Sequence, residues 1–179
     1  SNAFVGWYNG HPDFKDLNPD LNVEAAVIIG VGNVALDVAR VLAKTAAEMS
    51  VTDLVPHAAN AAHGSPITDV HMVGRRGPVE AAFTNVELRE MGELENALPV
   101  MNPDHLPYKV VAEYMSDRDL RLREKNIDTM RSFLDVSPDG KSKKVHFGFY
   151  ASPIEILGEN KVEGVRFEKT TVDPKGKVH

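Results

Sequence analysis

The stretch that decides the fold is Ala25-Ala26-Val27-Ile28-Ile29-Gly30-Val31-Gly32-Asn33-Val34-Ala35. Its first five residues form a short apolar run, which is typical of a strand buried on both faces of a parallel sheet. The last six have the pattern G-x-G-x-x-A. Residues 33–49 then carry apolar side chains around most of a helix. A glycine-rich turn between a strand and a helix is the context in which this pattern predicts a dinucleotide site.

Each small residue of the pattern has a physical reason. Gly30 permits the tight turn, Gly32 lets the backbone approach a pyrophosphate, and Ala35 allows close packing of helix on strand. The start of the helix offers free N–H groups and a partial positive charge to the phosphates. The alternative is a glycine turn that only packs a helix on a strand.

The residues after the second apolar run indicate which dinucleotide is bound. Residues 70–74 predict a strand, and Arg75 and Arg76 follow it. An NAD site would have an acidic residue here, whereas two guanidiniums can pair with the 2′-phosphate of NADP. Arg75 comes 40 residues after Ala35 instead of the usual ~20. We therefore read residues 45–69 as an insertion, a helix extension followed by a surface loop.

The remaining chain completes an α/β pattern. We expect an irregular lead-in over 4–24, a helix over 79–95, a short strand over 98–101 and helical spacing within 104–134. From Lys144 onward, alternating apolar residues around the turn at 158–160 predict a β-hairpin or meander. The expected fold is α/β, a Rossmann-like parallel sheet flanked by helices, with a β-meander.

Two groups of charged residues lie at helical spacing. Asp37, Arg40, Lys44 and Glu48 form one stripe, which we interpret as a solvated face with weak ion pairs. Glu87 and Glu90, three residues apart, also fit a solvated helix face. A carboxylate at this place could instead orient the guanidinium of a nearby arginine.

Composition excludes several classes of protein. The chain has 179 residues, 42% hydrophobic and 26% charged, which is typical of one globular domain. A net charge of −6 argues against nucleic-acid binding. The absence of cysteine excludes disulfides and thiolate metal sites. No apolar run approaches the ~18 residues of a membrane span. Ser1-Asn2-Ala3 is typical of an expression-tag remnant, so residues 4–179 are expected to be the domain.

The seven histidines are scattered along the chain, and none has convincing metal-ligand spacing. We therefore predict no metal site. His71 and His146 are interpreted as structural residues of strands.

Several motifs together resemble one known family. They are Phe4–Gly10, Gly30–Arg40, Val73–Pro78, Ala81–Thr84, Glu87–Glu90 and Ser152–Ile156. In this order they are similar to adrenodoxin reductase-type ferredoxin–NADP reductases, which are FAD flavoproteins with FAD/NAD(P)-binding domains. The family passes electrons between NADPH and a ferredoxin-like iron–sulfur protein.

The resemblance implies roles for individual residues. Asn33 and Val34 would contact the pyrophosphate, with Gly30, Gly32 and Ala35 around them. Arg75, Arg76 and Glu87 would surround the 2′-phosphate.

The same resemblance places two further groups near the flavin. Residues 7–10 and Glu90 would lie toward the flavin–nicotinamide junction, which makes Glu90 a candidate catalytic residue.

The resemblance also implies what this chain would do alone. The family has two glycine fingerprints, and this chain has one, so we expect the NADP-binding domain of a larger two-domain flavoprotein. FAD would be bound mainly elsewhere, and the chain alone would not turn over. The expected location is cytoplasmic.

Residues 118–144 carry eight basic side chains against five acidic ones. The simpler interpretation is a solvated helix and turn. The alternative is a surface with Arg118, Arg121 and Arg123 that docks an acidic ferredoxin.

Three other functions remain open at this stage. The chain could belong to a glutamate synthase-like flavoprotein, it could be a free-standing NADPH-binding module, or it could be purely structural.

Overall fold

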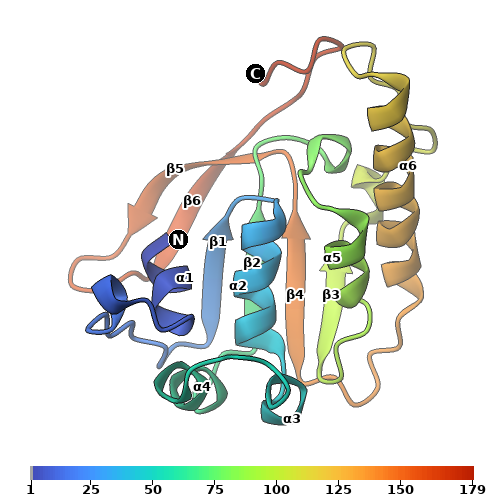
Figure 1. The fold of residues 1–179 in the computed structure, drawn as a ribbon. Helices are drawn as coiled ribbons and strands as arrows, with labels where there is room; N and C mark the ends of the chain where they lie inside the picture. The colour runs from blue at the N-terminus through green and yellow to red at the C-terminus, as the bar shows by residue number, and fades with distance from the viewer. Residues whose placement is uncertain (1) are drawn as a thin grey trace.

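A sheet of four parallel strands forms the centre of the computed structural model, which describes residues 2–179. The strands are β1 (Ala25–Ile29), β2 (Asp69–Val73), β4 (Lys143–Gly148) and β3 (Ala97–Met101), in this spatial order. Every pairing is parallel, so the carboxyl ends of all four strands lie at one edge (Figure 1). The predicted parallel α/β fold is confirmed.

Helices cover one face of this sheet. The helix α2 (Asn33–Ala43) lies against β1, β2 and β4. Leu36 and Ala39 of α2 are fully buried against Val70, Met72 and Val145 of the sheet, and this layer is the core. The helices α5 (Asn85–Glu90) and α6 (Asp117–Ser132) pack side by side near β3 (Figure 1).

The opposite face carries a two-stranded antiparallel hairpin, β5 (Ala151–Leu157) and β6 (Gly164–Lys169). The hairpin leaves an open groove beside β1, where Val27 is 41% and Ile29 55% exposed. The prediction that β1 is buried on both faces is therefore wrong. Only the face toward α2 is covered, so exposure alternates along the strand.

The lead-in and the insertion contain more regular structure than expected. Residues 4–24 include the helix α1 (Asn2–Tyr8) and the short 3-10 turn η1 (Pro12–Phe14). A Cβ on Gly6 would lie 2.2 Å from the Phe14 ring, so this glycine lets α1 pack on η1. Residues 45–69 form α3 (Ala46–Met49), which starts anew at the Thr45–Glu48 capping box, and α4 (Pro56–His63).

The second half of the chain differs in three places. The predicted helix over 79–95 is shorter and begins only after the 3-10 turn η2 (Pro78–Glu80). Residues 104–116 are not α-helical, because α6 begins after its N-cap Ser116. The alternation near residue 145 belongs to β4 in the parallel sheet, so only the hairpin β5–β6 is antiparallel. The remaining short elements are η3 (Pro103–His105) and η4 (Phe133–Asp135).

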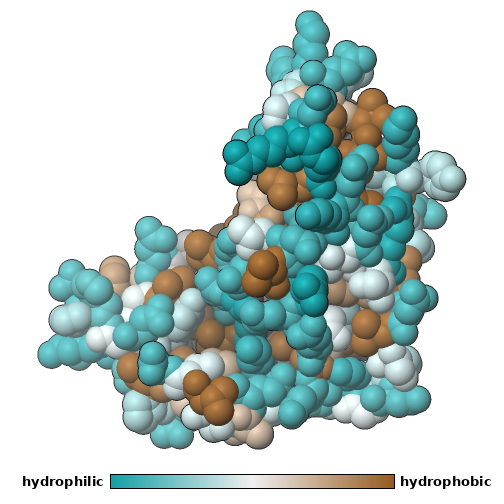
Figure 2. Space-filling model, turned by 45° about the vertical axis from the view of Figure 1, so that its right-hand side comes forward, coloured by the Kyte–Doolittle hydropathy of each residue, from teal (hydrophilic) through white to brown (hydrophobic). Residues whose placement is uncertain are grey.

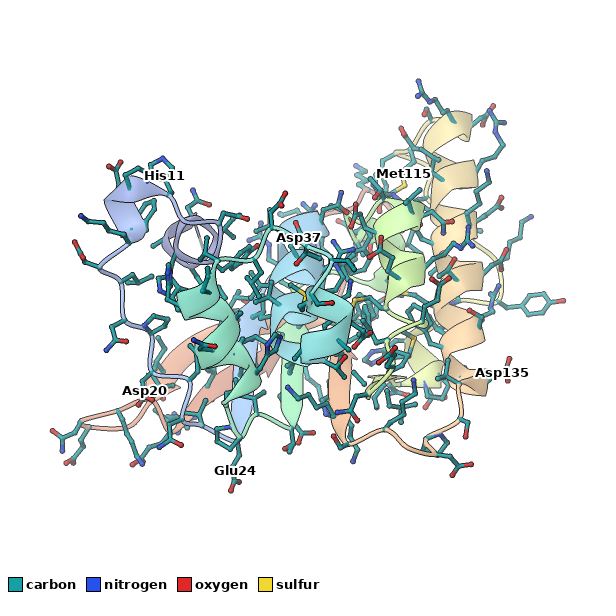
Figure 3. All side chains as sticks on the ribbon, turned by 60° about the horizontal axis from the view of Figure 1, so that its bottom comes forward. His11, Asp20, Glu24, Asp37, Met115 and Asp135 are labelled. Atoms are coloured by element: carbon teal, nitrogen blue, oxygen red, sulfur yellow. The ribbon has the colours of Figure 1, made fainter. Side chains whose placement is uncertain are left out.

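The outer surface is mixed in polarity. Figure 2 shows hydrophobic side chains as separate patches among hydrophilic ones. Figure 3 places His11 beyond α1 on one side, Asp135 after α6 on the other, and Asp37 on α2 between them. Within residues 2–179, no helix combines the length and the apolar character that a membrane crossing requires.

Candidate dinucleotide site

The turn between β1 and α2 has the geometry of a phosphate cradle. Gly30 adopts φ +137°, a conformation that favours glycine, and its N–H donates to Val73 O at 2.8 Å. The first turn of α2 contains no acidic residue. The backbone N–H of Val34 donates no hydrogen bond within residues 2–179, whereas the parallel bridge between Gly32 and Ala82 directs the N–H of Asn33 toward the chain at Ala82. A free donor and the positive end of the helix dipole therefore meet at this turn.

Gly32 is not required by the fold. Its φ of −140° is extended backbone that any residue can adopt. A Cβ added to Gly32 would meet only the Ala82 Cβ, at an ordinary 3.7 Å. Its missing side chain therefore leaves space beside the start of α2, as glycine does where a backbone approaches a phosphate.

The end of β2 reaches the same turn. Ile29 and Val73 are register partners, so both strands end together. A Cβ on Gly74 would come within 2.5 Å of the Val31 side chain, which shows how closely the two loops approach. The contact continues along the chain, where the N–H of Ala82 donates to Val31 O at 2.8 Å.

Arg75 and Arg76 lie in this loop with exposed side chains and form no ion pair within residues 2–179. Their backbone is fixed. Arg75 O accepts a hydrogen bond from Thr170 Oγ1 at 2.7 Å, and Arg76 O accepts one from Tyr150 N at 3.0 Å. Two free guanidiniums on a fixed loop can bind a phosphate with little backbone ordering.

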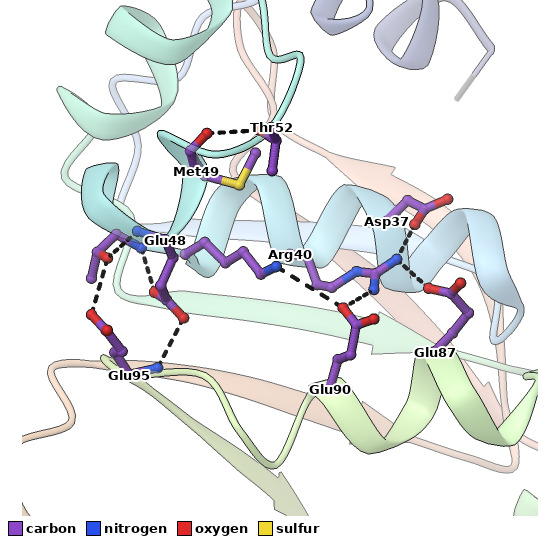
Figure 4. A network of polar contacts seen from close by, with 10 residues as sticks. Asp37, Arg40, Glu48, Met49, Thr52, Glu87, Glu90 and Glu95 are labelled. Carbon is purple, nitrogen blue, oxygen red and sulfur yellow. Dashed lines mark hydrogen bonds and ion pairs between the residues drawn. The ribbon is translucent and has the colours of Figure 1, made fainter.

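Within residues 2–179, Glu87 and Glu90 contact Arg40 of α2, and not the arginines that follow β2. Both carboxylates bind the guanidinium of Arg40, which also pairs with Asp37 of the same helix (Figure 4). The Arg40 side chain is only 13% exposed, so the prediction of weak ion pairs on a solvated face is wrong for it. Burial alone would lower the pKa of Arg40, but Asp37, Glu90 and Glu87 outweigh it and raise the pKa.

This network joins α2 to α5 rather than α5 to the arginine loop. Within the described chain, no ion pair links Glu87 to Arg75 or Arg76. The roles of Glu87 at the 2′-phosphate and of Glu90 in catalysis stay predictions. Trp7 is 4% exposed and its ring packs against His57, so its expected place near the flavin also stays a prediction.

Two residues of α6 support the segment that follows the arginine loop. Asn126, 2% exposed, donates from Nδ2 to Phe83 O at 2.9 Å. Arg123 donates to Ala81 O, so its guanidinium is not part of a free basic surface. The expected grouping of Arg123 with the exposed Arg118 and Arg121 is wrong. Asn126 carried no sequence signal, because its partner lies 43 residues away.

Known proteins with a similar chain share this arrangement of elements. NADPH-ferredoxin reductase FprA of Mycobacterium tuberculosis is 41% identical over 166 residues, 90% of this chain and 35% of that relative. NADPH:adrenodoxin oxidoreductase of Arabidopsis thaliana is 38% identical over 181 residues. The chain is homologous to one part of the adrenodoxin reductase-type NADPH–ferredoxin reductases. No protein-family model matches it.

A solved structure of M. tuberculosis FprA in complex with NADPH superimposes with a TM-score of 0.83 at 39% identity. The match covers 99% of this chain and 39% of that reductase. The predicted resemblance is therefore confirmed in sequence and in fold. The chain spans little more than a third of the length of these reductases.

Proposed function

We propose that this chain is the NADP(H)-binding part of an adrenodoxin reductase-type NADPH–ferredoxin reductase. The observation that carries the proposal is the meeting of two anion-binding features at one sheet edge. The start of α2, with the free N–H of Val34, lies beside the loop that holds Arg75 and Arg76. The homology to reductases named for NADPH supports the same assignment.

Different residues bind different parts of the nucleotide. The pyrophosphate binds at Asn33 and Val34, in the space that Gly32 leaves open. Arg75 and Arg76 bind the 2′-phosphate of the adenosine, because a planar guanidinium can donate two parallel hydrogen bonds to one phosphate. Ala35, 7% exposed, holds α2 close to β1.

In the complete reductase, NADPH supplies a hydride that reduces FAD, and electrons pass on to a ferredoxin-like iron–sulfur protein. Residues 2–179 offer one glycine cradle, and the arginine pair assigns it to NADP. FAD is therefore bound mainly by residues outside this range, and the chain alone binds NADP without turnover. Glu90, held by Arg40, is placed toward the nicotinamide end in this proposal.

The proposal also includes a binding surface for the iron–sulfur partner. The surface that would receive it contains Arg118 and Arg121, both exposed on α6. Complementary charge there would speed the encounter with an acidic protein. The location of the enzyme in this proposal is cytoplasmic.

Single substitutions of the two arginines test the assignment. Arg75→Ala and Arg76→Ala are titrated with NADP⁺ by calorimetry, and Arg118→Ala serves as the matched control on α6. Each loop variant should lose about 1.5–3 kcal/mol, roughly tenfold to a hundredfold in affinity, because a charge-assisted bond to phosphate is lost. Equal affinity in all three variants would contradict the assignment.

A further inference from the structure

Two histidines meet on the sheet face that α2 does not cover. His71 of β2 and His146 of β4 are direct register partners. Their rings are stacked, with centroids 4.3 Å apart and an interplanar angle of 9°. Asp69 lies two residues before His71 and therefore on the same face of β2. Two imidazoles and one carboxylate thus lie together on two neighbouring central strands.

The potential ligand atoms of these three side chains lie within 4.8 Å of one another. Asp69 Oδ1 and His146 Nε2 are 2.7 Å apart. Neither ring nitrogen of His71 is hydrogen-bonded within residues 2–179.

The carboxylate is oriented for this geometry by its neighbour. Thr68 Oγ1 donates to Asp69 Oδ2 at 2.8 Å, which leaves Oδ1 directed at His146. Hydrogen bonds of this kind, made to the atom that does not bind the ion, are typical around metal ligands.

The face remains accessible. The side chains of His146 and Asp69 are 27% and 36% exposed. In the same row across the sheet, Val27 is the register partner of His71 and is 41% exposed. An ion bound here would keep a coordination position open to water.

We propose that Asp69, His71 and His146 form a binding site for a divalent transition metal ion of the class that prefers imidazole, such as Zn²⁺. Two imidazoles and a carboxylate are a common ligand set for such ions, and three protein ligands leave the fourth position for water. The site is independent of the proposed NADP site, which lies at the carboxyl edge of the sheet. The two histidines are 75 positions apart in the chain, so local spacing does not reveal the site.

One neighbouring charge opposes the ion. Lys144, the register partner of Asp69, is exposed two residues before His146 on the same face. Its ammonium repels a bound dication, so the site should bind more tightly when this charge is removed.

Calorimetric titration of the full chain with ZnCl₂ tests the proposal. His71→Gln and His146→Gln should each reduce the affinity by at least about tenfold. Thr68→Val should reduce it by about tenfold, and Lys144→Gln should raise it. His11→Gln is the control, because His11 also lies near a carboxylate, Asp13, but on an exposed turn.

A second measurement needs no substitution. Addition of Co²⁺ to the wild-type chain should broaden the NMR signals of the His71 and His146 rings before those of the other five histidines. The site is supported if the wild-type chain and the His11→Gln control bind one equivalent of Zn²⁺ and the two histidine variants lose this binding. Binding that is absent, or equal in wild type and both variants, overturns it. Broadening that starts at other histidines overturns it as well.

Discussion

The side chain of Asn33 accepts a hydrogen bond from the backbone N–H of Thr84, with Oδ1 and N 2.8 Å apart. Asn33 is the first residue of α2, and Thr84 is the N-cap of α5. This bond closes the loop that carries Arg75 and Arg76 onto the glycine turn. It also engages the amide oxygen of Asn33 with a backbone donor of the neighbouring helix start.

Two substitutions at Asn33 should separate folding from binding. Asn33→Asp keeps the acceptor for Thr84 and adds a carboxylate in the first turn of α2, which should stabilise the fold by about 0.3–1 kcal/mol. The same charge should weaken NADP⁺ binding at least tenfold, because like charges ~4 Å apart repel by ~4 kcal/mol at a partly exposed site. Asn33→Ala should lower stability by about 1 kcal/mol.

Urea unfolding and NADP⁺ titration of both Asn33 variants provide the check. If Asn33→Asp binds as tightly as wild type, no phosphate lies at the start of α2.

Gly32→Ala should leave the fold intact and damage the site. The added Cβ meets no atom closer than 3.7 Å, but Gly32 is the N-cap of α2, where alanine is less favourable, so stability should fall by no more than about 1 kcal/mol. Overpacking against the bound pyrophosphate should cost about 1–3 kcal/mol, roughly tenfold to a hundredfold in NADP⁺ affinity. Gly164→Ala in β6 is the matched control, because its Cβ would also meet its nearest atom at 3.7 Å. Equal NADP⁺ affinities for the two variants would contradict the binding of the pyrophosphate at the glycine turn.

Arg40→Leu should destabilise the chain, since it leaves Asp37, Glu87 and Glu90 close together without their cation. The expected loss is about 2 kcal/mol. A fully buried pair would cost ~3–5 kcal/mol, but these carboxylates are partly solvated. The free energy of unfolding in urea measures the loss, with Arg118→Leu on the exposed face of α6 as the control. A loss below about 0.5 kcal/mol in Arg40→Leu would show that the network is not structural.

The pH dependence of the free energy of unfolding should reflect the ionisation of the Glu48 carboxyl group. Burial alone would raise the pKa of Glu48, but N–H donors of Thr45 and Glu95 outweigh it, and the pKa lies below its ordinary value of 4.5. A lowered pKa in the folded state means that the charge of Glu48 stabilises the fold above the unfolded pKa. This contribution is lost as the pH falls through the folded pKa.

Glu48→Gln should therefore cost about 1 kcal/mol near pH 7 and progressively less below pH 4.5. Unfolding of wild type and variant at a series of pH values measures the difference. A difference that stays constant between pH 7 and pH 3 would contradict the role of the charge.

Features that are local in sequence could be predicted. The glycine turn at residues 30–35 and the arginines at 75–76 each lie within a few residues of a strand end, and parallel pairing brings the two together. The strand limits of β1 were also predicted, because a short apolar run before glycine has few alternatives.

Features that depend on distant partners could not be predicted. Arg40 and Glu90 are 50 residues apart, so each resembled a solvated helix residue until the fold joined them. The helix α1 was missed because Gly6 weakens helix propensity, and only packing on Phe14 explains that glycine. The strand β4 alternates like a hairpin strand, yet it joins the parallel sheet, where one of its faces is left partly open.

The most direct test is a pair of calorimetric titrations of the wild-type chain, one with NADP⁺ and one with NAD⁺. The two ligands differ only in the 2′-phosphate that Arg75 and Arg76 are proposed to bind. We predict that NADP⁺ binds roughly a hundredfold more tightly, since the lost contacts are worth about 3 kcal/mol. Equal affinities, or binding of neither nucleotide, would contradict the assignment of this chain as an NADP-binding domain.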